Sequence, residues 1–287
     1  MSFEYTLGLY EKSMPNTLSF KEKLQCAREC GFDYMEISID ETDEKLARLD
    51  MTKEERFEIV KAMFEVGLPI RTMCLSGHRK YPLGSLNKET RNRALEIMEK
   101  AIDLSYDLGI RVIQIAGYDV YYEESNEETK ELFMKNLEKS VEMASKKGVI
   151  LAFETMETDF LNTVEKAMKY VNSINSPYLQ VYPDCGNVTN AMLNKEKTAS
   201  DDFKIGTGHL AAVHLKETVP GKFREIPFGT GHVNFEDIIE TSLSLGVRKF
   251  TTEFWHVGND DWKQVIKNTR KFMDIKFNNV LNNRGGK

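Results

Sequence analysis

Short apolar runs alternate with longer amphipathic stretches along most of this chain. A glycine closes the amphipathic stretch before most of the runs, and a Ser-Pro pair takes its place once; these marks are Gly31, Gly67, Gly109, Gly148, Ser176-Pro177, Gly208 and Gly246. Glycine in this position is typical of a helix that ends just before a strand. Together with the opening run "YTLGLY", the pattern predicts eight strands with helices between most of them.

Two of the predicted helices also show where they begin. Thr52 precedes Glu55 by three residues, and Ser125 precedes Glu128 by the same distance. A hydroxyl residue followed at this spacing by a glutamate is the capping box, which satisfies backbone N–H groups at a helix start. We therefore expect helices that begin after Thr52 and after Ser125.

The succession of βα units predicts an α/β fold of a particular kind. Eight such units in 287 residues favour a closed (β/α)8 barrel, the TIM barrel, over an open doubly wound sheet. No G-x-G-x-x-G motif follows a predicted strand, which weakens a dinucleotide-binding fold further. No linker-like stretch interrupts the chain, so we expect a single domain over residues 1–287, with about 280–287 as a frayed tail.

Composition and charge exclude several kinds of partner. The chain is 41% hydrophobic and 29% charged, with a net charge of −6. Nucleic acids and membrane surfaces are bound by basic faces, so we expect neither as a partner. No apolar run approaches the ~18 residues of a membrane span, and the N-terminus lacks the features of a signal peptide. The four cysteines match no zinc or redox spacing, which favours a reduced, cytoplasmic protein.

The last four predicted strands each deliver a polar side chain at or near their ends. The runs "VILAFETME", "LQVYPDCGN", "AAVHLKE" and "KFTTEFWH" contribute Glu154, Asp184, His214 and Glu253. In TIM barrels the catalytic groups lie at the carboxyl ends of the strands, so these four should meet. Three carboxylates and an imidazole repel one another unless a cation lies between them. We therefore predict one divalent metal ion, Mn²⁺, Mg²⁺, Co²⁺ or Zn²⁺.

Each of these residues also has an ordinary explanation when it is taken alone. A single acid after a strand is more often a solvated loop residue, and a single histidine is more often hydrogen-bonded in the core. His209 competes with His214, but an offset of five residues puts the two on opposite faces of a strand. Glu36, in "DYMEIS", is a weaker candidate for the same rim. The joint pattern over four consecutive strands carries the prediction.

These motifs resemble those of a known family. "LAFETME", "VYPDCGN", "VHLKET" and "TTEFWH" resemble the xylose-isomerase-like TIM barrels, and within them the L-ribulose-5-phosphate (L-xylulose-5-phosphate) 3-epimerase family, some of whose members are labelled hexulose-6-phosphate isomerases. The loops "LGLYEKSMP", "CLSGHRKYPLGS" and "PGKFREIPFGTGHVNF" are similar too, and the resemblance runs from about residue 4 to about 275. Related free-ketose epimerases carry a substrate-binding histidine where this chain has Asn187, which argues for a phosphorylated substrate.

The resemblance implies a metal-dependent epimerase that inverts C3 of a phosphorylated 2-ketopentose. A proton leaves C3, an enediolate forms, and a proton returns on the other face, which requires two bases. Glu154 and Glu253 end strands that lie three places apart around a ring of eight, so their carboxylates should face each other. The family assigns the two base roles to these glutamates. Asp184 and His214 would then hold the metal and orient the sugar.

The remaining contacts to a sugar phosphate are expected from the loops. Arg224 and His78 are candidates for binding sugar oxygens, as is Asn187. For the phosphate we expect Lys12 and Ser13 after the first strand, with backbone N–H groups near Gly117 and Tyr118 after the fourth.

Two other functions remain open from the residues. An aldose–ketose isomerase would use a similar metal site and also moves a proton beside a carbonyl. A non-catalytic sugar-phosphate-binding barrel is the alternative outside enzymes. An endonuclease is disfavoured, because only five histidines and a net charge of −6 are present. The sequence leaves open which metal and which pentulose are used, and whether the chain forms a homodimer.

Overall fold

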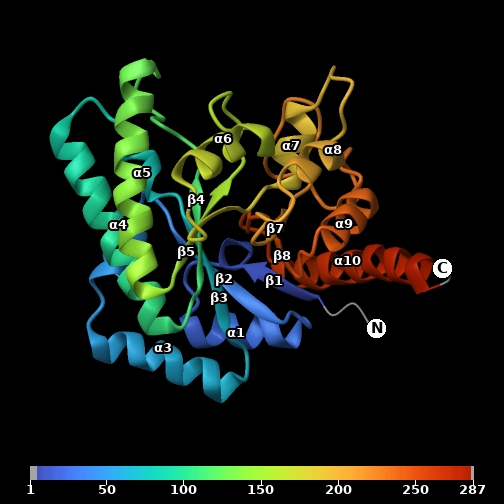
Figure 1. The fold of residues 1–287 in the computed structure, drawn as a ribbon. Coiled ribbons are helices and arrows are strands. Elements are labelled where there is room, and N and C mark those ends of the chain that lie inside the picture. Colours follow the sequence, from blue (N-terminus) through green and yellow to red (C-terminus); the bar gives the residue numbers. More distant parts are fainter. Residues whose placement is uncertain (1–4, 286–287) are drawn as a thin grey trace.

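The eight predicted strands are all present in the computed structural model, which describes residues 5–285. All neighbouring pairs run parallel, and helices lie between most of them (Figure 1). The strands are β1 (Thr6–Tyr10), β2 (Tyr34–Ile39), β3 (Ile70–Leu75), β4 (Val112–Ala116), β5 (Ile150–Glu154), β6 (Leu179–Val181), β7 (Val213–Leu215) and β8 (Lys249–Thr252).

The sheet curls until its two edges meet. Its strand order is β6-β5-β4-β3-β2-β1-β8-β7, so β6 and β7 are the edges. Single bridges join them, Val181 to Leu210 and Asp184 to His214, and the His214 N–H donates to Pro183 O at 2.9 Å. The predicted TIM barrel is therefore confirmed, with a seam between β6 and β7 that is joined by isolated bridges and not by a continuous ladder.

Helices surround the strands in Figure 1, with α4 and α5 on one side and α10 on the other. The α-helices are α1 (Phe20–Glu29), α2 (Asp43–Ala47), α3 (Lys53–Val66), α4 (Lys88–Leu108), α5 (Glu127–Lys147), α6 (Val164–Ile174), α7 (Cys185–Ala191), α8 (Ala199–Ile205), α9 (Phe235–Ser244) and α10 (Trp262–Gly285). The expected frayed tail from about 280 is thus helical as far as Gly285, and residues 286–287 lie outside the described part. Among residues 5–285, no helix has the length and apolar character needed to cross a membrane.

One of the two expected helix starts differs from the sequence prediction. Thr52 and Glu55 form the capping box of α3, as predicted. At α5 the cap is instead Asn126, whose side chain accepts the Thr129 N–H at 3.0 Å while the Thr129 hydroxyl accepts the Asn126 N–H at 2.9 Å. The Ser125 hydroxyl donates to Asp119 at 2.7 Å and is not available for capping.

The barrel interior contains a polar layer below the rim. Tyr34 and Tyr182 are both buried, and their hydroxyls lie 2.8 and 2.6 Å from Thr251 Oγ1. Gly8 makes room for this layer, because a Cβ there would lie 2.2 Å from the Tyr34 ring. The Tyr182 hydroxyl also donates to Glu36 at 3.0 Å. The layer therefore supports the groups at the carboxyl end of the barrel by hydrogen bonds as well as by packing.

Candidate active site

The four side chains predicted to meet at the rim do so in the structure. Glu154 is the last residue of β5, Asp184 caps α7, His214 lies in β7, and Glu253 directly follows β8. One potential ligand atom from each lies within 4.8 Å of the others, and all four side chains are buried. Parallel strands in a ring bring them together because their carboxyl ends share one rim.

The chemistry of this cluster fits a divalent cation. Asp184 Oδ2 and Glu253 Oε2 are buried without a hydrogen-bond partner, which is costly for carboxylate oxygens. The Lys216 ammonium lies 3.2 Å from Asp184 Oδ2 and 3.4 Å from Glu253 Oε2, so it offsets one of the three negative charges. An ion between the four ligand atoms would supply the missing partners.

Glu36 fixes the orientation of the histidine. Its Oε1 lies 2.6 Å from His214 Nε2, and both side chains are fully buried. An ionised carboxylate can only accept, so Nε2 carries the proton. Nδ1 then faces the other acids, 3.7 Å from Glu154 Oε1 and 3.5 Å from Glu253 Oε2. In the neutral imidazole Nδ1 is then the unprotonated nitrogen; it lies 3.1 Å from Gln114 Nε2 and faces the proposed metal position, as in metal-binding histidines.

The pKa values of the cluster reflect several carboxylates that are close together and buried from solvent. Burial raises the pKa of Asp184 to about 8. Burial, together with the charge of Glu253, also raises the pKa of Glu154. Burial would lower the pKa of His214, but Glu36, Glu253 and Glu154 together outweigh it and raise that pKa well above its usual range. Burial would also raise the pKa of Glu253, but Lys216 and His214 lower it below its usual range. Negative charge on Asp184 and Glu154 is thus disfavoured in this cluster, and a bound cation would stabilise it.

A narrow pocket lies over the cluster. It is lined by Glu154 and Glu253 from the cluster and by the side chains of Tyr10, Lys12, Cys74, Ser76, Arg79, Met156, Glu157, Asn187, Lys216, Phe223, Arg224 and Trp255. The open space is about 40 Å³, far less than a ketopentose phosphate occupies. Phe223 and Arg224 belong to the segment after β7, and Arg224 lies over the Trp255 ring at 5.5 Å. This segment therefore forms part of the wall that a bound sugar phosphate would contact.

The residues expected to bind a phosphate do not gather at one place. Lys12 lines the pocket, where its ammonium pairs with Asp40. The Ser13 hydroxyl donates to Tyr10 O at 2.7 Å, and the Tyr118 N–H donates to Ala116 O at 2.9 Å. At Gly117 a Cβ would lie 2.6 Å from Glu154 O, so that backbone is packed against its neighbour. Of the four, only the Lys12 side chain is in a position to meet a ligand.

The residues expected to bind the sugar also differ in position. Arg224 and Asn187 line the pocket, and the Asn187 amide donates to Thr155 O at 2.8 Å while its Oδ1 has no partner. His78 lies away from the pocket, buried, with Nε2 at 3.0 Å from Ala94 O. Its place in a turn of 3₁₀ helix after β3 directs Arg79, not His78, to the pocket. The expected contact of His78 with a sugar hydroxyl is not supported.

Sequence reasoning missed several members of the site. Lys216 was overlooked, although it follows His214 by two residues and the period of a strand places both on one face. Glu36 was considered only as a weaker rim candidate, but it contacts His214 directly and orients its ring. Arg79 and Glu157 gave no signal, because a short 3₁₀ turn and a loop hold them and the pattern does not determine the course of either.

Comparisons with known proteins agree with this fold and site. The model of the xylose isomerase-like TIM barrel family matches residues 24–275. The chain is 44% identical over 278 residues to the L-ribulose-5-phosphate 3-epimerase UlaE of Escherichia coli O139:H28, which covers 96% of both chains, and equally so to UlaE of Escherichia fergusonii.

Similar folds occur among solved structures with much lower identity. An L-ribulose 3-epimerase structure superposes with a TM-score of 0.78 at 19% identity, covering 98% of this chain and 97% of that one. The motifs around Glu154, Asp184, His214 and Glu253 predicted the family correctly. With a family model matched over most of its length and relatives this similar, the chain belongs to the xylose isomerase-like TIM barrel family and, within it, to the family of the L-ribulose-5-phosphate 3-epimerases.

Proposed function

We propose that this protein is a metal-dependent epimerase that inverts C3 of a phosphorylated 2-ketopentose, interconverting L-ribulose 5-phosphate and L-xylulose 5-phosphate. The observation that carries the proposal is the pair Glu154 and Glu253, two buried carboxylates from opposite parts of the ring that meet around His214 Nδ1. The 44% identity to proteins named L-ribulose-5-phosphate 3-epimerase supports the substrate class.

The two glutamates account for inversion. The C3 proton is acidic because C3 is bonded to the carbonyl carbon, and its removal gives an enediolate. One glutamate removes the proton from one face, and the other glutamate returns a proton to the opposite face. Since the reaction runs both ways, the glutamate that is the base for one epimer is the acid for the other.

The same side chains would hold the metal. Glu154, Asp184, Glu253 and His214 Nδ1 offer three oxygen ligands and one nitrogen, a set that suits Mn²⁺, Mg²⁺, Co²⁺ or Zn²⁺. The bound ion supplies positive charge that polarises the substrate carbonyl. Lys216 supplies a further positive charge beside Asp184 and Glu253, where negative charge develops during proton removal.

Two cationic side chains that line the pocket suit the substrate phosphate. Lys12 and Arg79 both line it, and the Arg79 Nε–H is buried without a partner. Arg79 also lies within 3.9 Å of Glu41 Oε1 and over the Tyr121 ring, which hold the guanidinium in place. Arg224 and Asn187, which line the same pocket, are the groups we assign to sugar oxygens.

The cysteines support the cytoplasmic location that we propose. Cys26, Cys30, Cys74 and Cys185 are all free and buried. Free thiols are typical of a reducing compartment, which supports the cytoplasm as the location.

Proton NMR in D₂O tests the proposal directly. The protein is incubated in D₂O with L-xylulose 5-phosphate and Mn²⁺ or Mg²⁺, and the metal is chelated only before the spectrum is recorded. Deuterium should enter at C3 while the L-ribulo epimer accumulates. A product with the carbonyl moved to C1 would identify an aldose–ketose isomerase instead. Substrate that raises the melting temperature without any exchange at C3 would identify a binding protein.

A further inference from the structure

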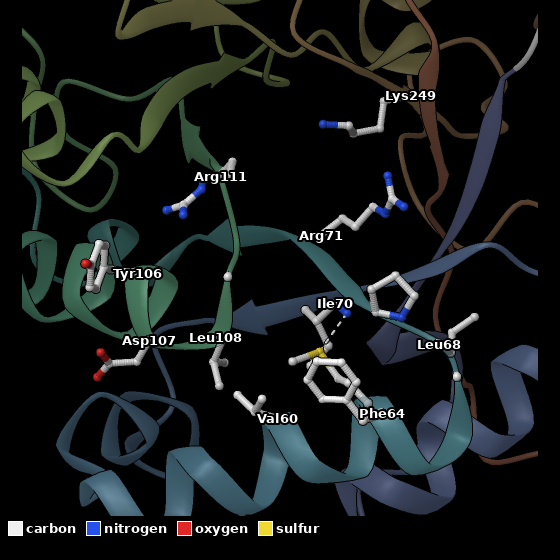
Figure 2. Close-up of a pocket in the computed structure, with 14 residues that line it drawn as sticks. Val60, Phe64, Leu68, Ile70, Arg71, Tyr106, Asp107, Leu108, Arg111 and Lys249 are labelled. Atoms are coloured by element: carbon white, nitrogen blue, oxygen red, sulfur yellow. Dashed lines mark hydrogen bonds between the residues drawn. The ribbon is translucent and has the colours of Figure 1, made fainter.

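A second cavity lies at the end of the barrel opposite the acid cluster. It is lined by the starts of three strands, at Ile70 and Arg71 of β3, Arg111 before β4 and Lys249 of β8, and by the last turns of α3 and α4 (Figure 2). Its volume is about 660 Å³. This is within the range of small-molecule sites, ~300–1,000 Å³. The proposed epimerase chemistry uses none of these residues.

One side of the cavity is basic and its charges are not neutralised. Arg71, Arg111 and Lys249 surround the opening in Figure 2, and within residues 5–285 none of them forms an ion pair or a hydrogen bond through its side chain. The acid of the cavity, Asp107, is engaged elsewhere, 2.7 Å from Arg56. Three unpaired cations around one cavity are unexpected in a chain with a net charge of −6.

The burial of Lys249 strengthens this observation. Its side chain is partly buried, and burial together with the nearby charge of Arg71 lowers its pKa. A lysine in that environment gains from an anion, because an anion restores the interactions that water no longer provides.

The other side of the cavity is apolar. Val60, Phe64 and Leu68 face the basic side chains across the opening in Figure 2. The Tyr106 ring also lines the cavity, with Arg111 over it at 5.9 Å. Phe64 is 84% exposed and Tyr106 49%, although both border a concave space. Exposed aromatic side chains that rim a cavity are typical of a surface that binds something.

We propose that this cavity binds a small amphipathic anion. One carboxylate or phosphate group would pair with Arg71 and Lys249, with Arg111 nearby, and an aromatic or branched aliphatic body would cover Phe64, Val60 and Leu68. A sugar phosphate fits poorly, because its hydroxyls would face the apolar wall. The site is separate from the acid cluster, so the inference does not rest on the proposed function.

Fluorescence titration with anilinonaphthalene sulfonate tests the site, because this dye combines an anionic group with an aromatic body. The dye should bind at one site per chain, and phenylpropionate and phenyl phosphate should both displace it, whereas inorganic phosphate and benzyl alcohol should not. If only one of the two displaces it, that result identifies the anionic group that the site takes. Competition by inorganic phosphate as strong as that by phenyl phosphate would overturn the apolar half of the proposal.

Substitutions inside and outside the cavity test whether the dye binds there. Arg71→Gln with Lys249→Gln should weaken binding at least ~10-fold, the scale of lost charge-assisted contacts, and Phe64→Ser should weaken it about as much by removing apolar contact. Lys53→Gln and Phe57→Ser, on the same helix α3 but outside the cavity, are the matched controls and should bind as the wild type does. Equal affinity in the variants and the controls would overturn the proposal.

Two further measurements address a variant that does not fold and a cavity that is covered by a second subunit. If the Lys249 variant fails to fold, as judged by circular dichroism, Arg71→Gln with Arg111→Gln replaces it, because both arginines are exposed. Sedimentation velocity of the wild type and of Phe64→Ser gives the oligomeric state. A dimer that Phe64→Ser dissociates would make this face a subunit interface and would rule out the ligand site.

Discussion

Glu36 and His214 are in direct contact inside the barrel, with Glu36 Oε1 2.6 Å from His214 Nε2 and both side chains fully buried. The two residues are 178 positions apart in the chain, yet the contact determines which nitrogen of the imidazole faces the acid cluster. Glu36 is held in turn by the Tyr182 hydroxyl at 3.0 Å. The metal site therefore includes a supporting carboxylate that is not itself a ligand.

The first prediction concerns this supporting carboxylate. Glu36→Gln keeps the shape and one acceptor oxygen but removes the charge that orients His214 and raises its basicity. Metal affinity should fall ~10–100-fold, the usual effect of changing such a partner. Isothermal titration with Mn²⁺ measures it, with Glu157→Gln as the control, since Glu157 lines the pocket but is outside the cluster. An unchanged affinity in Glu36→Gln would show that His214 needs no such partner.

The second prediction separates two roles of Asp184. Its Oδ1 accepts the Asn187 N–H at 2.7 Å and so caps α7, while its Oδ2 faces the cluster. Asp184→Asn keeps a capping oxygen but loses the ligand charge, whereas Asp184→Ala loses both. Both variants should therefore lose bound metal by elemental analysis, and the alanine variant should lose a further ~1 kcal/mol of stability, the value of a helix cap. Full metal content in either variant would remove Asp184 from the ligand set.

The third prediction tests the two-base mechanism. Glu154→Gln and Glu253→Gln each keep one ligand oxygen but cannot accept the C3 proton. Epimerisation should fall by ~10²-fold or more in both directions in either variant. Each variant should still exchange the C3 proton of the one epimer whose hydrogen faces the remaining glutamate, so the two should retain slow exchange on opposite epimers. Exchange on the same epimer in both would mean that one base serves both faces, provided that metal content, measured in parallel, is retained.

The fourth prediction concerns recognition of the phosphate. Arg79→Gln and Lys12→Ala should each weaken binding of the phosphorylated pentulose ~10-fold, because a charge-assisted contact is lost. The free ketose should be affected little, since it lacks the group that these cations bind. Arg224→Gln is the comparison and should weaken both ligands alike, as expected for a contact to the sugar. Equal losses on both ligands in Arg79→Gln and Lys12→Ala would assign the two cations to structural roles.

The fifth prediction is a dependence of stability on pH that comes from a buried charge cluster. Glu11 is fully buried and contacts Lys23, Lys45 and Arg48. Burial alone would raise the pKa of Glu11, but the three cations lower it to about 2. Because the folded pKa is below the ordinary value, this group stabilises the fold above pH ~4.5, and the contribution is lost as the pH falls toward ~2.

Urea unfolding measures that contribution. At neutral pH, Glu11→Gln should lower the free energy of unfolding by ~3–5 kcal/mol, because the buried lysines lose their partner. The difference between wild type and variant should shrink as the pH is lowered through this range. A difference that stays constant down to pH ~3 would show that Glu11 contributes by its packing and not by its charge.

Most of the fold could be predicted from the sequence, because the period of the apolar runs and the glycines between them are local signals. The strand ends at Glu154 and Glu253 were identified in this way. The capping of α5 was missed by one residue, since Ser125 and Asn126 are both good caps and only the contact with Asp119 decides between them. Local pattern alone cannot resolve such a choice.

The less predictable parts of the site depend on long-range geometry. The contact of Glu36 with His214 depends on the register of strands that are three places apart in the ring, which no local pattern encodes. Arg79 and His78 are neighbours in one short turn, and the sequence does not say which of them points into the pocket. The basic cavity was not foreseen, because its cations come from strand starts that are far apart in the sequence.

The seam between β6 and β7 has a consequence for how the chain holds its shape. Asp184 and His214 are bridged to each other across this seam, and both are among the proposed ligands. An ion bound by both residues would link β6 to β7, the one neighbouring pair among the eight strands that only isolated bridges connect. The metal-free protein should then differ from the metal-bound protein chiefly in how often β6 and β7 separate, while the other seven pairs of neighbouring strands stay hydrogen-bonded in both.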